Sequence, residues 1–121
     1  MSYSNAYTCT YRFPAATLSS AATVGRLIGP SGKSGRLVDI AVLVTTGVTV
    51  AACTVTAGTE ADTDAYGSLT VPISAANSGT NGASDSAATT TVLPADTVVA
   101  IAAGGECTAG AGDILVTIDW Y

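Results

Sequence analysis

Two segments with strictly alternating side chains constrain the fold of this chain most strongly. In residues 36–46 and again in residues 114–121, large apolar residues occupy every second position. A period of two places those side chains on one face of an extended strand, whereas a helix would need a period near 3.6. The two strands are therefore expected to supply a shared core. The predicted core residues are Val38, Ile40, Val42, Val44, Ile114, Val116, Ile118 and Trp120.

The remaining composition favours strands as well. Valine, isoleucine and threonine are abundant, while glutamate, lysine and leucine, which favour helices, are scarce. Extended segments separated by turn residues recur along the chain and predict six to eight strands. We therefore expect an all-β fold, an antiparallel two-sheet β-sandwich or jelly roll. The predicted strands are residues 7–13, 23–28, 36–46, 48–57, 65–73, 97–103 and 114–121.

Several local features predict how these strands are arranged. Both faces of residues 36–46 are largely apolar, so this strand is expected to be central and covered on both sides. Gly47 then predicts a tight antiparallel connection. Pro72 cannot donate a ladder hydrogen bond and therefore predicts an edge strand. Residues 74–91 and 104–112 consist mainly of small residues and are expected to be loops.

The length limits the domain organisation. With 121 residues, the chain is expected to form a single β-sandwich domain over residues 1–121, with residues 1–22 as an N-terminal arm. The start lacks a basic segment followed by an apolar one, so we expect no export signal and synthesis in a reducing cytosol. No apolar run approaches the ~20 residues that span a bilayer, so no membrane partner is expected.

Charge is divided along the sequence. All four cations precede residue 37, all nine carboxylates follow it, and the net charge is −5. So few cations argue against nucleic acid as a partner. Arg26, Lys33 and Arg36 surround the loop at residues 29–35 and are candidate partner-binding residues. The alternative is that they pair with the chain's own carboxylates in residues 39 and 60–64.

The motifs that suggest chemistry are incomplete. Gly32-Lys33-Ser34 ends like a phosphate-binding loop, but Leu27 stands where its first glycine belongs and a strand follows. Residues 60–67 begin like a calcium loop but lack two oxygen ligands. The chain has no histidine to act as a base for a serine or cysteine nucleophile. We therefore predict no catalytic residues, no metal, no cofactor and no enzyme activity.

The cysteines and tyrosines are the other reactive or recognition-prone residues. Cys9, Cys53 and Cys107 match neither a zinc site nor a disulfide framework, and are expected to be free thiols. Tyr3 and Tyr7 lie four residues apart, on one face of an extended segment, and are candidate partner-binding residues for an arm that reaches a neighbour. The alternative for these rings is packing in the core or at a subunit interface.

Residues 24–40, 44–46, 58–67, 93–97 and 111–121 resemble small all-β proteins encoded among the head genes of tailed bacteriophages. Some of these are capsid decoration, or cement, proteins, which bind the outside of the shell, often as trimers at local threefold positions. The resemblance implies a non-enzymatic virion protein that stabilises the capsid, with the major capsid protein and its own copies as partners. It also implies a location on the capsid exterior after synthesis in the host cytoplasm.

Other functions are compatible with the same residues. A receptor- or glycan-binding fibre module would need exposed aromatic rings. Another virion assembly subunit, such as a tail component, would need only the fold. A small hydrolase or lyase on a jelly roll would need catalytic side chains that the motifs above do not provide.

Overall fold

The computed structural model describes residues 7–19, 21–81 and 92–121, which form nine strands and no helix. Six to eight strands were predicted, and the difference comes from the short β6 and β7, which lie where the sequence indicated a loop and a turn. The strands are β1 (Tyr7–Thr17), β2 (Ala22–Ile28), β3 (Gly35–Thr49), β4 (Cys53–Gly58), β5 (Gly67–Val71), β6 (Ser78–Asn81), β7 (Val92–Leu93), β8 (Val98–Gly105) and β9 (Ala109–Trp120).

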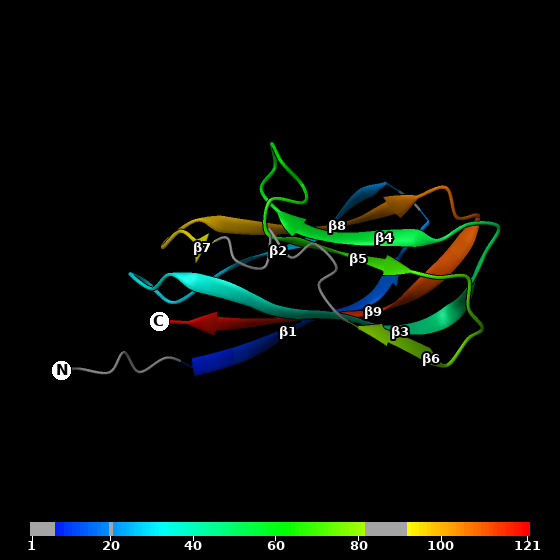
Figure 1. The fold of residues 1–121 in the computed structure, drawn as a ribbon, viewed down its shortest axis with the longest axis horizontal. Coiled ribbons are helices and arrows are strands. Elements are labelled where there is room, and N and C mark those ends of the chain that lie inside the picture. Colours follow the sequence, from blue (N-terminus) through cyan, green and yellow to red (C-terminus); the bar gives the residue numbers. More distant parts are fainter. Residues whose placement is uncertain (1–6, 20, 82–91) are drawn as a thin grey trace.

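The strands form two antiparallel sheets that pack face to face (Figure 1). Sheet A has the order β1-β9-β3-β6, with β7 also paired to β3, and sheet B has the order β2-β8-β4-β5. Without β7, the first strand pairs with the last, the second with the second last, the third with the third last, and the two middle strands with each other. This pairing is that of a jelly roll, and it confirms the predicted fold class.

The core lies between the sheets, and Trp120 fills one end of it. A Cβ atom added to Gly29 or Gly35 would lie 2.5 Å or 2.6 Å from the indole ring, so these two glycines leave the space that the ring occupies. The indole Nε1 donates to the Tyr11 hydroxyl at 2.9 Å. Burying the one tryptophan of the chain therefore requires both glycines, which the sequence alone showed only as turn residues.

Seven of the eight predicted core residues are buried, and Val38 is the exception with 44% of its surface exposed. The register of β3 against β9 shifts between Leu37 and Asp39, because Val38 is an extra residue in the strand. Such a bulge reverses the alternation, so Leu37 points inward in place of Val38. The outer face of β3 is also open, since Leu43 is exposed, and the prediction that β3 is covered on both sides is wrong.

The predicted connections differ from the observed ones in three places. β3 runs through Gly47 to Thr49, and the chain then crosses to sheet B, so no tight hairpin forms at Gly47. Residues 104–112 contribute to β8 and β9 and leave only a short turn at 106–108. Part of the predicted 74–91 loop is β6, and residues 82–91 lie outside the described residues. The edge position predicted for the strand before Pro72 is confirmed.

Most of the described part of the predicted N-terminal arm belongs to the chain's own sheet A. β1 pairs with β9 in continuous register from Tyr7 to Phe13 and resumes after a bulge at residues 14–15. Pro14 therefore bends the first strand but does not end it. Residues 1–6 lie outside the described residues, so a reaching arm remains a prediction for that segment alone.

A disulfide joins Cys53, at the start of β4, to Cys107, in the turn between β8 and β9. The two Cα atoms are 5.5 Å apart, a usual separation for a disulfide. Both cysteines are buried, and Cys9 is the free thiol. The prediction of three free thiols is therefore wrong for two of them: a sequence separation of 54 residues does not show that β4 and the β8–β9 turn meet.

Candidate functional site

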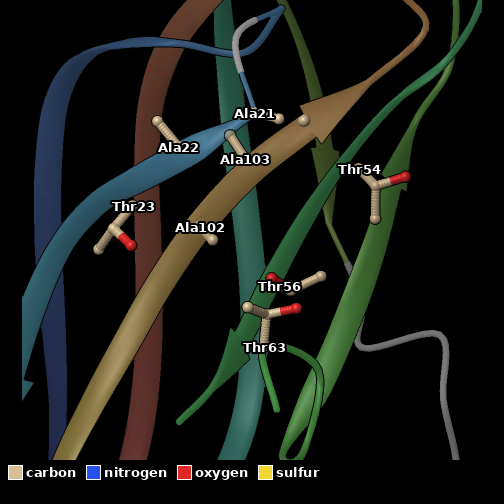
Figure 2. A pocket seen from close by; sticks show the side chains of 9 residues that line it. Ala21, Ala22, Thr23, Thr54, Thr56, Thr63, Ala102 and Ala103 are labelled. Carbon is tan, nitrogen blue, oxygen red and sulfur yellow. The ribbon is translucent and has the colours of Figure 1, made fainter. Parts of the chain in front are cut away.

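A hollow of about 380 Å³ lies on the outer face of sheet B. Its lining comes from Ala21 and β2, from β4 and β8, and from Thr63 of the loop between β4 and β5 (Figure 2). The alanines of the lining have only a methyl group as side chain and Gly104 of β8 has none, so the depression lies where larger side chains would otherwise stand. Threonine hydroxyls are the polar side-chain groups in its lining, and none of the lining residues titrates near neutral pH. The hollow can therefore offer hydrogen bonds and shape but no acid or base.

Acidic side chains come closest together in the loop between β4 and β5. A hydrogen bond with Asp64 raises the pKa of Asp62, and burial and the negative charge of Asp64 act in the same direction. Both side chains are exposed. Among the residues that the structure describes, no three His, Cys, Asp or Glu side chains are grouped so that they could hold a metal ion.

Two of the three candidate cations form ion pairs within the chain. Arg26 of β2 contacts Glu60 at 2.5 Å, and Arg36 of β3 contacts Asp119 of β9 at 3.1 Å. Glu60 belongs to the acidic segment that the sequence offered as an alternative partner. The remaining described cation outside β1, Lys33, is in no ion pair with another described residue.

The three candidates do not share one surface. Arg26 lies on the outer face of sheet B, while Arg36 lies on the outer face of sheet A, because the turn between β2 and β3 carries the chain from one sheet to the other. Lys33 is at that turn. This contiguous segment therefore places Arg26 and Arg36 on opposite faces of the molecule, with Lys33 in the turn between them.

Exposed apolar side chains lie on the outer faces of both sheets at one end of the sandwich, which we call the Ile28 end. Ile28 and Val98 are cross-strand neighbours in sheet B, and Val92 is opposite Arg36 in sheet A. Tyr121 exchanges two backbone hydrogen bonds with Ser34 of the β2–β3 turn. Figure 1 shows the C-terminus, β7 and the β2–β3 turn together at this end. The Ile28 end comprises the exposed residues Ile28, Val92, Val98 and Tyr121 together with Lys33.

The backbone of the turn at this end is held in place. The Gly32 N–H donates to the Asp96 carboxylate at 3.0 Å, and the Lys33 N–H donates to the Pro30 carbonyl at 3.1 Å. Gly32 has a φ of +77°, which favours glycine at this position. The turn therefore presents Lys33 from a defined conformation. The sequence indicated a flexible loop here, and the bond across to Asp96 was not visible in it.

The candidate tyrosines are only partly placed. Tyr7 is the first residue of β1 and is opposite Trp120, so its backbone lies at the Ile28 end; its side chain and all of Tyr3 lie outside the described residues. Among the described aromatic side chains, Trp120 and Tyr66 are buried and Tyr11 and Phe13 are packed against the core. Tyr121 is the exposed ring in the part of the chain that the structure describes.

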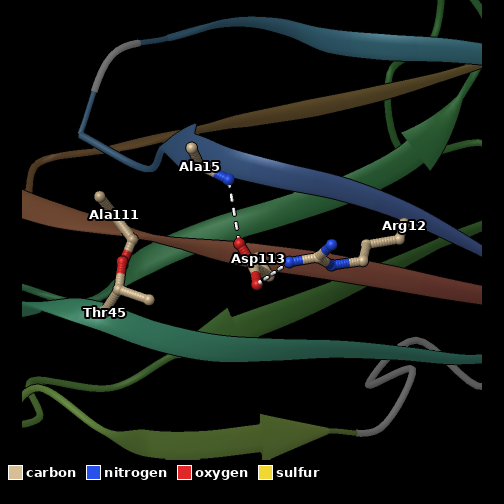
Figure 3. Close-up of polar contacts among 5 residues, drawn as sticks. All are labelled: Arg12, Ala15, Thr45, Ala111 and Asp113. Atoms are coloured by element: carbon tan, nitrogen blue, oxygen red, sulfur yellow. Dashed lines mark hydrogen bonds and ion pairs between the residues drawn. The ribbon is translucent and has the colours of Figure 1, made fainter.

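A polar cluster at the bend of β1 was not singled out from the sequence. Asp113 of β9 accepts a hydrogen bond from the Arg12 guanidinium at 2.7 Å and another from the Ala15 N–H at 3.0 Å (Figure 3). Ala15 has a φ of +55°, an uncommon conformation for alanine. The carboxylate thus ties the bulge of β1 to β9. Because Ala15 and Asp113 are 98 positions apart in the sequence, local sequence patterns do not show this contact.

We expect the stability of the protein to fall in acid through two carboxylates of β9. The hydrogen bond from Arg12 lowers the pKa of Asp113, and that from Thr8 lowers the pKa of Asp119. A carboxyl group with a lowered folded-state pKa stabilises the fold above its unfolded value, about 3.9, and this contribution is lost as the pH falls through the folded-state pKa. Melting temperatures measured from pH 7 down to 2 should show less loss in Asp113→Asn than in wild type. An identical pH profile for the two would contradict this assignment.

Comparisons with known proteins do not assign the chain to a family: no family model, curated protein or solved structure matches it. Within the described residues, no helix is long and apolar enough to cross a membrane.

Proposed function

We propose that this chain is a non-enzymatic structural protein of a phage head that binds the exterior of the capsid and stabilises it. The observation that carries the proposal is the Ile28 end, where exposed apolar side chains of both sheets lie at the same end of the sandwich as Lys33. Apolar side chains exposed together are a common mark of a protein-binding surface. The jelly roll by itself does not decide the function, because this architecture serves many.

The distribution of ion pairs supports docking through the Ile28 end. The ion pairs of Arg26 and Arg36 are satisfied within the chain, so these side chains serve the fold. Lys33 is the candidate cation that remains for a partner surface. In the proposed complex it orients the chain on an acidic shell, while Ile28 and its apolar neighbours supply the contact area.

The buried disulfide supports a protein that works outside the cell. Disulfides persist in oxidising surroundings and are uncommon in a reducing cytosol. The outside of a released virus particle is an oxidising environment, and the Cys53–Cys107 bond would hold the fold there. The proposed sequence of events is synthesis in the host cytoplasm followed by oxidation during or after release.

The resemblance to decoration proteins further implies a homotrimer bound to the major capsid protein. A receptor- or glycan-binding module remains the second candidate, but it is less well supported. The described surface offers one exposed aromatic ring, Tyr121, where stacking platforms use several.

Sedimentation with capsids tests the proposal. The chain should pellet with capsids built from the major capsid protein encoded alongside it, to a saturating occupancy, and binding should weaken as salt increases. A double change, Ile28→Asp with Lys33→Glu, should reduce occupancy at least tenfold because it opposes both the apolar contact and the charge.

The matched control is Arg26→Glu with Glu60→Arg, which reverses the ion pair between β2 and the β4–β5 loop without changing the net charge. It should leave occupancy close to wild type. Unaltered occupancy in the Ile28/Lys33 variant, with its melting temperature unchanged, would refute docking through the Ile28 end. An absence of binding by the wild-type chain would refute the proposed function itself.

A further inference from the structure

The outer edge of β1 presents a row of backbone groups with no partner strand among the described residues. Ser34 and Tyr121 exchange both of their backbone hydrogen bonds, so Tyr121 directs its N–H and C=O toward β3. The direction in which the backbone N–H and C=O groups point alternates along β9, so the even-numbered residues of β9 bond to β1. Their cross-strand neighbours are the odd-numbered residues of β1 from Tyr7 to Phe13, which therefore bond to β9. The N–H and C=O groups of Thr8, Thr10 and Arg12 point away from the sheet.

Over Tyr7–Phe13, this edge lacks the bulges, prolines and short length with which proteins commonly block strand addition. β2 has a bulge between Thr23 and Gly25, β5 is five residues long and is followed by Pro72, and β6 is described over only four residues. β1 instead keeps a continuous register over Tyr7–Phe13, with its proline beyond that stretch. Figure 1 shows β1 along the border of sheet A.

The side chains of the three outward residues are already fixed by β9. Thr8 donates to Asp119, Thr10 contacts the Thr117 hydroxyl at 3.1 Å, and Arg12 contacts Asp113 at 2.7 Å. These contacts hold the side chains on the outer face of sheet A and away from the edge. An added strand would therefore find these side chains already ordered, which reduces the entropy lost on binding.

We propose that a second copy of this chain occupies the edge, with the two β1 strands antiparallel about a twofold axis at Thr10. Thr10 then faces Thr10 of the other copy, and Thr8 faces its Arg12. This register is the one that uses all three outward residues of both chains, and it gives about six backbone hydrogen bonds. Sheet A becomes continuous across the dimer.

Charge complementarity favours this pairing of identical chains. Arg36, Asp119 and Thr8 are cross-strand neighbours in one row of sheet A. The Thr10-centred register places Arg12 of the second copy next in that row, so a positive charge approaches the Asp119–Thr8 pair and no like charges are opposed. On the inner face, Cys9 and Tyr11 are partly exposed at the edge of the core, and the second copy would cover them. The twofold contact uses the backbone edge of β1 and none of the exposed side chains that define the Ile28 end, so it does not depend on the proposed function.

The first test changes a backbone donor that the chain's own sheet does not use. Thr10→Pro removes the outward N–H at the centre of the contact, and edge strands tolerate proline at such positions. In sedimentation equilibrium, we expect a dissociation constant roughly tenfold or more above that of wild type, since two of about six interface hydrogen bonds are lost. Thr10→Ser keeps the N–H and is the matched control.

The second test reads the register through cysteine cross-linking in a Cys9→Ser background. Opposed residues in a hydrogen-bonded pair have Cα atoms about 5.5 Å apart, within disulfide range. Thr10→Cys should therefore give a covalent dimer with oxidised glutathione. Thr8→Cys is equally placed on the edge but would lie roughly 13 Å from its own copy, and it should remain monomeric on denaturing gels.

A wild-type dimer that Thr10→Pro weakens, together with cross-linking at residue 10 and not at residue 8, supports the twofold contact. A hexamer that Thr10→Pro converts to trimers also supports it, as two trimers joined through β1. A monomer at all concentrations, a trimer that Thr10→Pro leaves intact, or equal cross-linking at both positions overturns it.

Discussion

Replacing Cys53 by alanine is expected to lower the free energy of unfolding by about 4 kcal/mol. The disulfide closes a loop of 54 residues, and a cross-link over that length removes much of the conformational entropy of the unfolded chain. The change also leaves the thiol of Cys107 in a buried position. Urea unfolding followed by tryptophan fluorescence measures the effect, because Trp120 is the only tryptophan and is buried.

The matched control is Cys9→Ser, which removes the free thiol from the edge strand and should change stability by less than about 1 kcal/mol. Thiol titration of denatured, unreduced protein should find one thiol in each chain. Three thiols, together with a Cys53→Ala variant as stable as wild type, would show that the bond does not form and would remove its support for an extracellular role.

Ile118→Ala is expected to destabilise the protein by roughly 2–5 kcal/mol, the usual cost of a cavity in a packed core. Ile118 is fully buried in β9, between β1 and β3, so few neighbours can move to fill the space. Ile40→Ala in β3 should act in the same way. Thermal and urea unfolding of the two variants measure the loss.

Val38→Ala is the discriminating control because it distinguishes the observed register from the one that the sequence predicted. Val38 continues the same alternation in the sequence as Ile40, yet the bulge in β3 turns it outward. The change should therefore alter stability by about 0.5 kcal/mol or less. A loss equal to that of Ile118→Ala would place Val38 in the core and contradict the bulge.

The fold class and most of the core could be predicted because they depend on local periodicity. The alternation in β9 runs without interruption from residue 109 to 120, and its even-numbered residues are all buried. The bulges could not be predicted, since an extra residue in one strand is defined by the register of its partner. One such residue in β3 was enough to exchange Val38 for Leu37 in the core.

Contacts between distant segments account for the remaining differences. The sequence offered Glu60 as one alternative partner for the cations, and Arg26 pairs with it, but Arg36 pairs with Asp119 on the opposite face. The chain crosses between the sheets in the turn that separates these residues, and nothing in the local pattern marks that crossing. The disulfide and the Arg12–Asp113 contact depend on the same long-range topology.

The sequence offers Lys33 of the Ile28 end as a candidate, for its charge and its place in a glycine-rich turn. Ile28 and Val98 are predicted only as strand residues, and Val92 lies between a predicted loop and a predicted turn. They meet because β2 pairs with β8 and β7 pairs with β3 at one end of the jelly roll. The sheet pairing determines which apolar residues are exposed at this end. Those exposed residues, together with Lys33, make the end a candidate binding surface.

Amide hydrogen exchange of the chain, free and bound to capsids, tests the proposed docking most directly. The account predicts slower exchange on binding at residues 28–34 and 92–98, with little change at the opposite end of the sandwich, at residues 50–52 and 72–76. Exchange rates unchanged by capsids, or protection confined to residues 50–52 and 72–76, would contradict capsid binding through the Ile28 end.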